Sequence, residues 1–588
     1  MRTYIPFLPS VSLGACLLVA ACGGATPPAA PTPIANGAWP YELPLKLSPR
    51  PTVPAITAGD LATRLYIIAD DSMRGRETGQ IGNVMVTNYV AHEFQRLGLR
   101  PAGDSGSYFQ TIPFMQGGFD PGLALSFKGQ GMVPWQDYSP LASVGRLTFA
   151  DDVALTDAPT LYAGRWGDTS YAIDPARAKG AILVLRIPVN AQGAPVIGFW
   201  NVSDPRVDAL AGSVAGILIL GPRNAVAALG NFFRQGRGAL HTDAPSMGPA
   251  GFMAVDSSVR GALFPQPIDS VAPGTWGAPL SATQRYVWRP TPAPARNVVA
   301  ILPGSDPVLR NEYVAVSAHN DHVGMLATPI DHDSLRAANA VLRPIGANMP
   351  VRAPTPEEWT RISADIARAR AARGGAIRMD SVFNGAIDDG SGTVILLELA
   401  EYLAHAPRLK RSILFVSHTG EEKGLLGSQW FTDHPTVPRD SIIAAFNMDM
   451  PATGRDPHAE PGAPYFLQLI GSRRLSTQLG QTIDSINGSY GRDSLAIDYS
   501  YDAPGHPLNR YCRSDHFMYA RYGIPITYIS LGYTRDYHMV SDEPEYIDYA
   551  HSAKVADFVR DIVVTSANRP LKYVVDGVRQ DPKLPCRQ

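Results

Sequence analysis

The sequence predicts an α/β fold in which a mostly parallel sheet carries helices on both faces and is interrupted by a mainly β module. From residue 297 onward, short apolar runs of β type alternate with runs of helical periodicity. Such alternation favours parallel strands joined by helices. Residues 131–290 differ, because short β-type runs there are separated by Gly, Pro and Asp turns. At 588 residues the chain is too long for one core, so two or three domains are expected.

The N-terminal residues are typical of an export signal. Small apolar residues 11–21 follow a basic residue and end at Cys22 and Gly23. This pattern predicts a bacterial lipoprotein signal over residues 1–21, with Cys22 as the lipidated first residue; a plain secretory signal is the alternative. A Pro-rich tether is expected over residues 22–55. Because Gly23 is not the aspartate that would indicate inner-membrane retention, we expect an outer-membrane anchor facing the periplasm or the cell surface.

Composition limits the expected partners. The formal net charge is −2, so there is no electrostatic case for a nucleic-acid partner. No apolar run after the signal is long enough to span a bilayer, so membrane contact is expected only through the lipid anchor at Cys22. Once the signal and the anchor are set aside, Cys512 and Cys586 remain. They could form a disulfide in an oxidising compartment or stay as two free thiols.

The N-terminal part of the main domain, residues 56–130, contains two runs of helical periodicity. They cover residues 59–73 and 83–98, and the second ends at a glycine. The pair His92-Glu93 begins like the His-Glu-x-x-His zinc motif, but position 96 is arginine. We therefore interpret this pair as part of a solvated helix face.

The alternating elements follow a linker at residues 290–296. Strands are expected at 297–302, 312–318, 411–417, 443–449 and 524–530, and helices at 392–405, 424–433 and 550–565. They predict a domain over residues 296–570, followed by a C-terminal tail at 571–588.

Polar residues follow these strands at the point where each strand ends. His319 and Asp321 end one strand, Glu421 and Glu422 follow another, and Asp449 ends a third. Ligands of parallel α/β sheets bind outside the carboxyl ends of the strands. We therefore expect these side chains to lie close together.

Two further segments add ligands to this set. His538 lies in the loop after the last strand, and Asp388 and Asp389 lie on a glycine-flanked turn just before a helix. Imidazole and carboxylate together suit zinc. Carboxylate bridging places two cations ~3.5–4 Å apart, which is the geometry of a two-metal hydrolase. A carboxylate outside the ligand set would then move the proton, and adjacent Glu421 and Glu422 fit a base and a ligand.

Five motifs occur in a recognisable order. They are His319-x-Asp321, Asn384-Gly-Ala-Ile-Asp388-Asp-Gly-Ser-Gly, Gly420-Glu421-Glu422, Asn447-Met-Asp449 and Tyr537-His538. Together with Gly75-Arg-Glu-Thr-Gly79 and Arg513-Ser-Asp-His516, they resemble the signature of the co-catalytic zinc exopeptidases. That family includes zinc aminopeptidases, glutamate carboxypeptidase II and glutaminyl cyclases. The module at 131–290 resembles a protease-associated domain.

The resemblance implies two Zn²⁺ ions bridged by Asp388. His319 and Asp449 would complete one site, and Glu422 and His538 the other. The implied activity is hydrolysis of peptides, with removal of N-terminal residues preferred. The alternatives are carboxypeptidase-type or dipeptidase-type cleavage, glutaminyl cyclisation, and a non-catalytic binding protein of the same fold.

The resemblance also implies roles for residues around the metals. Glu421 would be the general acid and base. Asp321 would orient the histidine ligand two positions before it. Asp389 would support the bridging aspartate, and the peptide bond between these two aspartates is typically cis in the family. Tyr537 and Arg513 are weaker candidates, for oxyanion stabilisation and substrate contact, and structural packing is an equal alternative for both.

One departure from the family is an insertion at residues 325–383. Its middle predicts a helix that begins at a capping box, Thr355-Pro-Glu-Glu358, and ends at Gly374-Gly375. The insertion starts soon after a metal ligand, so we expect it to line or cover the mouth of the site. A surface segment packed away from the site is the alternative.

Overall fold

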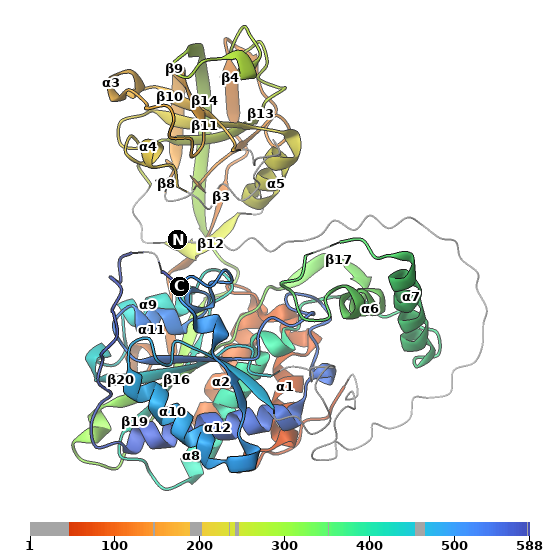
Figure 1. The fold of residues 1–588 in the computed structure, drawn as a ribbon, viewed down its shortest axis with the longest axis vertical. Coiled ribbons are helices and arrows are strands. Elements are labelled where there is room, and N and C mark those ends of the chain that lie inside the picture. The colour runs from red at the N-terminus through yellow and green to blue at the C-terminus, as the bar shows by residue number, and fades with distance from the viewer. Residues whose placement is uncertain are drawn as a thin grey trace. The chain divides into compact units, whose positions relative to one another are not determined.

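The computed structural model describes residues 46–144, 147–188, 203–234, 236–241, 246–350, 352–452, 465–584 and 586–588. The predicted signal at 1–21, the lipidation site Cys22 and most of the tether lie outside these residues. The described chain divides into two units (Figure 1): Pro113–Thr291 forms one, and the segments up to Ile112 and Pro292–Gln588 form the other. The larger, discontinuous unit carries all the predicted metal ligands.

Nine strands form the sheet of the larger unit within its described residues. Their order is β1-β15-β19-β16-β20-β23-β21-β22, and β2 also pairs with β15. The bounds are β1 Arg100–Pro101, β2 Phe109–Thr111, β15 Arg296–Leu302, β16 Tyr313–His319, β19 Ser412–His418, β20 Ile442–Met448, β21 Phe466–Ile470, β22 Ala496–Asp498 and β23 Ile526–Ser530.

The predicted α/β class is confirmed, and the sheet mixes parallel with antiparallel strands. The central strands β19, β16, β20 and β23 are parallel, as are β21 and β22. Strand β15 is antiparallel to β19, β1 and β2, and β21 is antiparallel to β23. Parallel pairing needs a long crossover. Residues 303–312, all of them described, contain no α-helix, so the chain simply reverses between β15 and β16.

Helices cover both faces of this sheet. Along β15, Val298 and Ala300 pack into one core and Val299 and Ile301 into the other, as the two-residue period of a strand requires. The first core includes α1 Ala58–Ile68, α2 Ile81–Arg96, α8 Gly392–His405, α10 Thr477–Ser489 and α12 Tyr549–Asn568. The second includes α9 Leu426–Asp433 and α11 His516–Ala520.

The insertion at 325–383 belongs to the larger unit. It consists of an antiparallel strand pair, β17 Met325–Asp331 and β18 Met379–Val382, with helices α6 His332–Leu342 and α7 Pro356–Ala371 between them (Figure 1). The predicted capping box is confirmed, because the Thr355 hydroxyl accepts from the Glu358 amide and the Glu358 carboxylate accepts from the Thr355 amide. Helix α6 was not predicted.

The smaller unit is mainly β. Its described residues form a ten-stranded sheet in the order β12-β3-β14-β9-β10-β11-β13-β6, with β4 beside β14 and β5 beside β4. The bounds are β3 Phe114–Phe119, β4 Ala124–Phe127, β5 Gln130–Gly131, β6 Tyr138–Pro140, β9 Asp152–Arg165, β10 Ile182–Arg186, β11 Gly216–Gly221, β12 Arg237–Leu240, β13 Ala250–Val255 and β14 Trp276–Pro290. A short pair, β7 Ser143–Val144 with β8 Leu147–Thr148, and helices α3 Pro175–Ala178, α4 Pro205–Asp208 and α5 Arg223–Arg234 complete the unit.

This unit begins earlier than the sequence predicted. The expected boundary was residue 131, whereas the compact unit starts at Pro113. The reason is that β3 and β4 both pair antiparallel with β14, the last strand of the unit. Strand pairing so distant along the chain left no local signal at the boundary.

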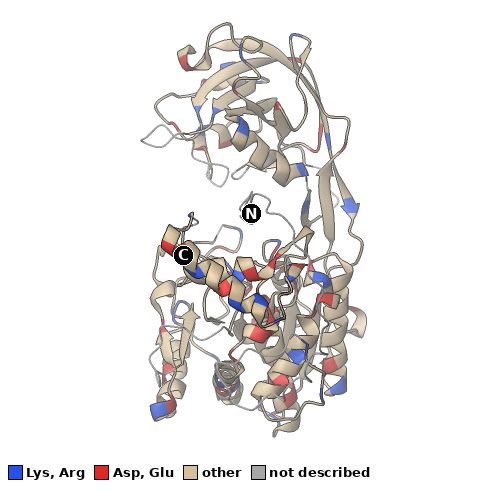
Figure 2. Ribbon diagram, turned by 90° about the vertical axis from the view of Figure 1, so that its right-hand side faces the viewer, with Lys and Arg blue, Asp and Glu red and all other residues tan. Residues whose placement is uncertain are grey.

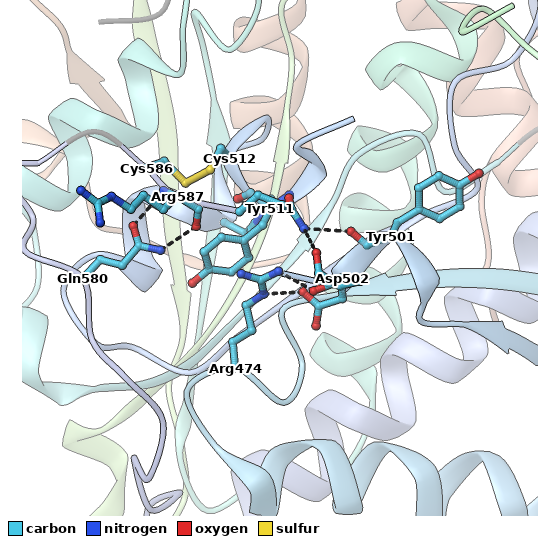
Figure 3. Close-up of a disulfide and its surroundings, with 11 residues drawn as sticks. Arg474, Tyr501, Asp502, Tyr511, Cys512, Gln580, Cys586 and Arg587 are labelled. Atoms are coloured by element: carbon cyan, nitrogen blue, oxygen red, sulfur yellow. Dashed lines mark hydrogen bonds and ion pairs between the residues drawn. A yellow bond between two sulfur atoms is a disulfide. The ribbon is translucent and has the colours of Figure 1, made fainter. Parts of the chain in front are cut away.

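A disulfide joins Cys512 to Cys586, so the question left open by the sequence is resolved in favour of pairing (Figure 3). The Cα atoms of the two cysteines are 5.6 Å apart. The chain around Cys586 also packs in place. The Gln588 side chain accepts from the Tyr511 amide at 2.8 Å and donates to the Tyr501 carbonyl at 3.0 Å. Residues 571–588 are therefore part of the larger unit.

Acidic and basic residues are interspersed along the chain. Lys and Arg are interspersed with Asp and Glu along the ribbon of both units (Figure 2), in keeping with the small net charge. None of the described helices has the length and the apolar character that crossing a membrane would require.

Candidate metal centre

The predicted ligands meet at the carboxyl edge of the four parallel strands. His319 is the last residue of β16, and Asp449 directly follows β20. The register pairs Ser317 with Asn447, so His319 and Asp449 lie opposite each other. Glu422 follows β19, and His538 lies in the loop after β23.

Asp388 approaches this edge from the turn before α8, and its two oxygens face different partners. Oδ1 lies 3.1 Å from Nε2 of His319, which is also 3.8 Å from Oδ1 of Asp449. Oδ2 lies 3.0 Å from Nε2 of His538, which is also 3.0 Å from Oε2 of Glu422. The ligands therefore form two groups that share Asp388, as a bridging carboxylate requires.

These atoms fit zinc. The Nε2 atoms of His319 and His538 are buried and have no hydrogen-bond partner among the described residues, although each points at carboxylates. Zinc bonds of about 2.0 Å in a tetrahedral site put ligand atoms about 3.3 Å apart, close to the separations above. Burial disfavours a charged His538 ring, yet Glu422 and Asp388 raise its pKa to about 10. The site thus carries excess negative charge that a cation would balance.

His322 belongs to the second group and was missed by the sequence analysis. Its ring is fully buried, and Nδ1 lies 2.7 Å from Oε1 of Glu422 and 3.9 Å from Oδ2 of Asp388. The two oxygens of Glu422 thus have different partners, with His322 on one and His538 on the other. The available signal was a second histidine directly after the motif His319-x-Asp321.

Backbone amides fix the turn that carries Asp388. Asp389 accepts from the amides of His319 at 3.1 Å, Gly392 at 3.0 Å and Met450 at 3.0 Å. It therefore ties the turn to the ends of β16 and β20. Asp542 accepts from the amides of Ile387 at 2.8 Å and Asp388 at 3.1 Å. The peptide bond between Asp388 and Asp389 is cis, as the resemblance implied.

Asp321 orients His319 in a different way from the one expected. Nδ1 of His319 lies 3.1 Å from the backbone carbonyl of Asp321 and 3.6 Å from its carboxylate, which is too long for a hydrogen bond. The carboxylate instead accepts from the Thr78 hydroxyl at 2.8 Å and from the Glu421 amide at 3.1 Å. Asp321 therefore connects a metal ligand with the candidate base.

Glu421 lies beside both groups and belongs to neither. Burial raises the pKa of its carboxyl well above the ordinary value, and the neighbouring Asp449 and Glu422 raise it further, against His319. Its backbone amide donates to Asp321, which fixes the backbone of Glu421 beside the strand end. This is the position that a proton carrier needs.

The segment Gly75–Gly79 supports the same edge. Arg76 is fully buried and donates to the carbonyls of Asn320 at 3.0 Å and Gly385 at 2.8 Å, which lie beside His319 and before Asp388. Since both contacts are to backbone, Arg76 holds two ligand-bearing segments at a fixed separation.

The two weaker candidates lie on the same side of the site. The ring of Tyr537 stacks on the ring of His538 with centroids 3.8 Å apart. The Arg513 guanidinium lies 4.5 Å from the centre of the Tyr533 ring, and Tyr533 packs against Tyr537. Tyr537 therefore packs directly against a candidate metal ligand.

A third group of possible ligands, His332, Asp380 and Glu543, lies at the base of the insertion. Arg378 donates to Glu543 and lies 3.7 Å from Asp380. Both ring nitrogens of His332 have partners at 3.2 Å, the Asp380 carboxylate and the Tyr546 hydroxyl. A guanidinium already supplies the positive charge, so we assign this group to packing.

Comparison with known proteins agrees with the site. Residues 297–563 match the model of Peptidase family M28. A probable zinc metalloprotease of Pyrenophora teres f. teres is 28% identical over 210 residues, which are 33% of this chain and 43% of that protein. Aminopeptidase Y of Saccharomyces cerevisiae is 31% identical over 153 residues, 25% of each chain.

The chain thus spans half or less of the length of the curated relatives named here. A solved aminopeptidase from Aneurinibacillus sp. strain AM-1 aligns with 89% of this chain and 98% of its own, at 15% identity and a TM-score of 0.46. The family match includes both ligand groups and Glu421. Over residues 297–563 the chain is therefore similar to peptidase family M28.

Proposed function

We propose that this protein is a zinc-dependent metallopeptidase that holds two zinc ions. One ion would be held by His319, Asp388 and Asp449, and the other by Asp388, Glu422 and His538. The observation that carries the proposal is Asp388, whose two carboxylate oxygens each face a buried histidine nitrogen without a hydrogen-bond partner among the described residues.

Bound zinc supplies a nucleophilic water at neutral pH and polarises the carbonyl group of the scissile peptide. Glu421 takes the proton that this water loses as its oxygen attacks the carbonyl carbon. The same carboxyl then gives the proton to the leaving amine as the C–N bond breaks. Asp321 holds Glu421 and His319 in fixed positions during both transfers, because its carboxylate contacts the Glu421 amide and its carbonyl contacts the His319 ring.

The preferred reaction is removal of N-terminal residues. The name of the yeast relative supports an aminopeptidase, and so does the ordered set of motifs. The resemblance of residues 131–290 to a protease-associated domain supports peptide hydrolysis over cyclisation.

A pair of peptides tests this assignment. Protein from residue 23 onward, loaded with zinc, is offered one peptide with a free amino terminus and the same peptide acetylated, and the products are identified by mass. Loss of the first residue from the free peptide alone supports an aminopeptidase. Cleavage at the carboxyl end, or cleavage of both peptides, would change the assignment from aminopeptidase to carboxypeptidase-type activity. Two bound zinc ions without cleavage would favour cyclisation or a binding role.

We also infer that the protein is exported and lipid-anchored through Cys22, which lies outside the described residues. The disulfide between Cys512 and Cys586 supports an oxidising compartment. Cys22→Ala should release the protein from the membrane fraction of its cells. Unchanged membrane association of that variant would refute the anchor.

A further inference from the structure

The loop that carries His538 is held along its length by the insertion. This loop, residues 533–546 and here called the His538 loop, joins β23 to α12. The insertion, residues 325–383, contacts it at its start, middle and end. Since both segments lie in the larger unit, these contacts belong to one compact body.

The middle of the His538 loop is a tight turn that needs support. His538 has a φ of 55°, in the left-handed region that a non-glycine residue keeps only where its surroundings fix it. Asp536, which precedes His538, closes the turn by accepting hydrogen bonds from two residues that follow it. Its carbonyl accepts from the Met539 amide at 3.0 Å, and its carboxylate accepts from the Ser541 hydroxyl at 2.6 Å.

Helix α6 of the insertion holds the same carboxylate. Arg336 donates to Oδ2 of Asp536 at 3.1 Å, and Asn339 donates to Oδ1 at 3.3 Å. The two residues lie three apart and so share one face of the helix. Asp536 is 5% exposed, so these contacts are shielded from water and replace solvation that the carboxylate has lost.

The two ends of the loop are held as well. At the start, the Ala347 amide donates to the Tyr533 carbonyl at 3.2 Å, and Gly346 approaches so closely that a Cβ there would lie 2.3 Å from the same oxygen. At the end, Arg378 pairs with Glu543 and Glu545. Glu543 directly follows Asp542, which fixes the turn of Asp388.

We propose that the insertion positions a metal ligand: Arg336 and Asn339, acting through Asp536, fix His538 in its coordinating orientation. This deepens the expectation that the insertion covers the site, and it rests on the proposed two-zinc function. Helix α7 lies on the outer side, where Ile362 packs against Ala337 and Val341 of α6. Helix α7 therefore stabilises α6 from one side, and a different face of α6 contacts the His538 loop.

A metal titration without substrate tests the proposal, because a lid would change substrate binding and leave metal affinity alone. The variants are Arg336→Met with Asn339→Leu, and Asn339→Asp, which keeps the shape but sets a carboxylate against Asp536. Arg368→Met is the matched control, since Arg368 pairs with Asp365 on the exposed side of α7. Zinc content is measured against a graded chelator, and the unfolding midpoint of the metal-free protein is recorded for each variant.

Disruption of partners around a metal ligand typically weakens metal affinity 10–100-fold. We expect a loss of that size for one of the two zinc ions in both α6 variants, with the other zinc retained and the control unchanged. Arg336→Lys, which keeps the charge opposite Asp536, should recover part of the loss. Equal affinity in wild type and Asn339→Asp would overturn the proposal. Wild-type protein that binds fewer than two zinc ions would instead refute the proposed function.

Discussion

The disulfide between Cys512 and Cys586 should contribute several kcal/mol to the stability of the larger unit. The two cysteines are 74 residues apart in the sequence. In the chain-entropy description, closing a loop of that length removes about 4.5 kcal/mol of conformational freedom from the unfolded chain. The tail keeps other contacts when the bond is absent, since Tyr573 is buried in the core and its hydroxyl lies 2.8 Å from that of Ser566. Cys586→Ser should therefore destabilise the fold without detaching residues 571–580.

Hydrogen exchange of peptides from β16 and β20 measures the loss of stability in Cys586→Ser for the larger unit alone. A loss of 4.5 kcal/mol corresponds to roughly a thousandfold rise in the frequency of global opening. Wild-type protein treated with a reductant should exchange as fast as the variant, because both lack the same covalent bond. If reduced wild type and Cys586→Ser both stayed within about fivefold of oxidised wild type, or 1 kcal/mol, the reasoning from loop length would be refuted.

Three further predictions concern single residues. Glu421→Gln should keep both zinc ions and lower kcat by about 10²–10⁴-fold, and a near-normal rate would remove Glu421 from the mechanism. His322→Phe fills the same space without the donor to Glu422, so one zinc should bind about 10–100-fold more weakly in chelator competition; unchanged affinity would contradict a role for His322. His551 is buried, which lowers its pKa to about 4, below the pKa of the same side chain in the unfolded chain. At a pH between these two pKa values the unfolded state binds more protons than the folded state, so the free energy of unfolding falls as pH falls. His551→Gln can still donate to the Phe466 carbonyl. Between pH 7 and pH 5 the free energy of unfolding of this variant should fall by about 2 kcal/mol less than that of wild type. An equal fall in both proteins, measured by denaturation at each pH, would show that His551 does not titrate this way.

The sequence predicted best what depends on neighbouring residues. Helix α8 runs from Gly392 to His405, the range expected from its periodicity. The candidate ligands His319 and Asp449 lie at strand ends, as expected, because the end of an apolar run and the polar residue after it are both visible locally. Parallel strands present their carboxyl ends at the same edge of a sheet, and this rule predicted that these residues lie close together in space.

Features that depend on distant segments were not predictable in this way. The antiparallel pairing of β15 with β19 depends on a partner more than a hundred positions away. Helix α6 lacks the capping box that marks the start of α7, and it contacts α7 and the His538 loop. Asp542 and Asp536 look like ordinary loop aspartates in the sequence. Their importance becomes apparent only where the backbone amides and side chains that they contact are known.

The carboxylates that surround the metal centre divide into two kinds by what they contact. Asp388, Glu422 and Asp449 face histidine nitrogens, whereas Asp389 and Asp542 accept hydrogen bonds from backbone amides. A carboxylate is the side chain best suited to that second task, since both oxygens accept and neither donates. An amide in its place would turn an N–H group toward another N–H group. The acidity of this edge is therefore partly structural, because two of its aspartates fix the turn that carries Asp388, the candidate ligand common to both groups.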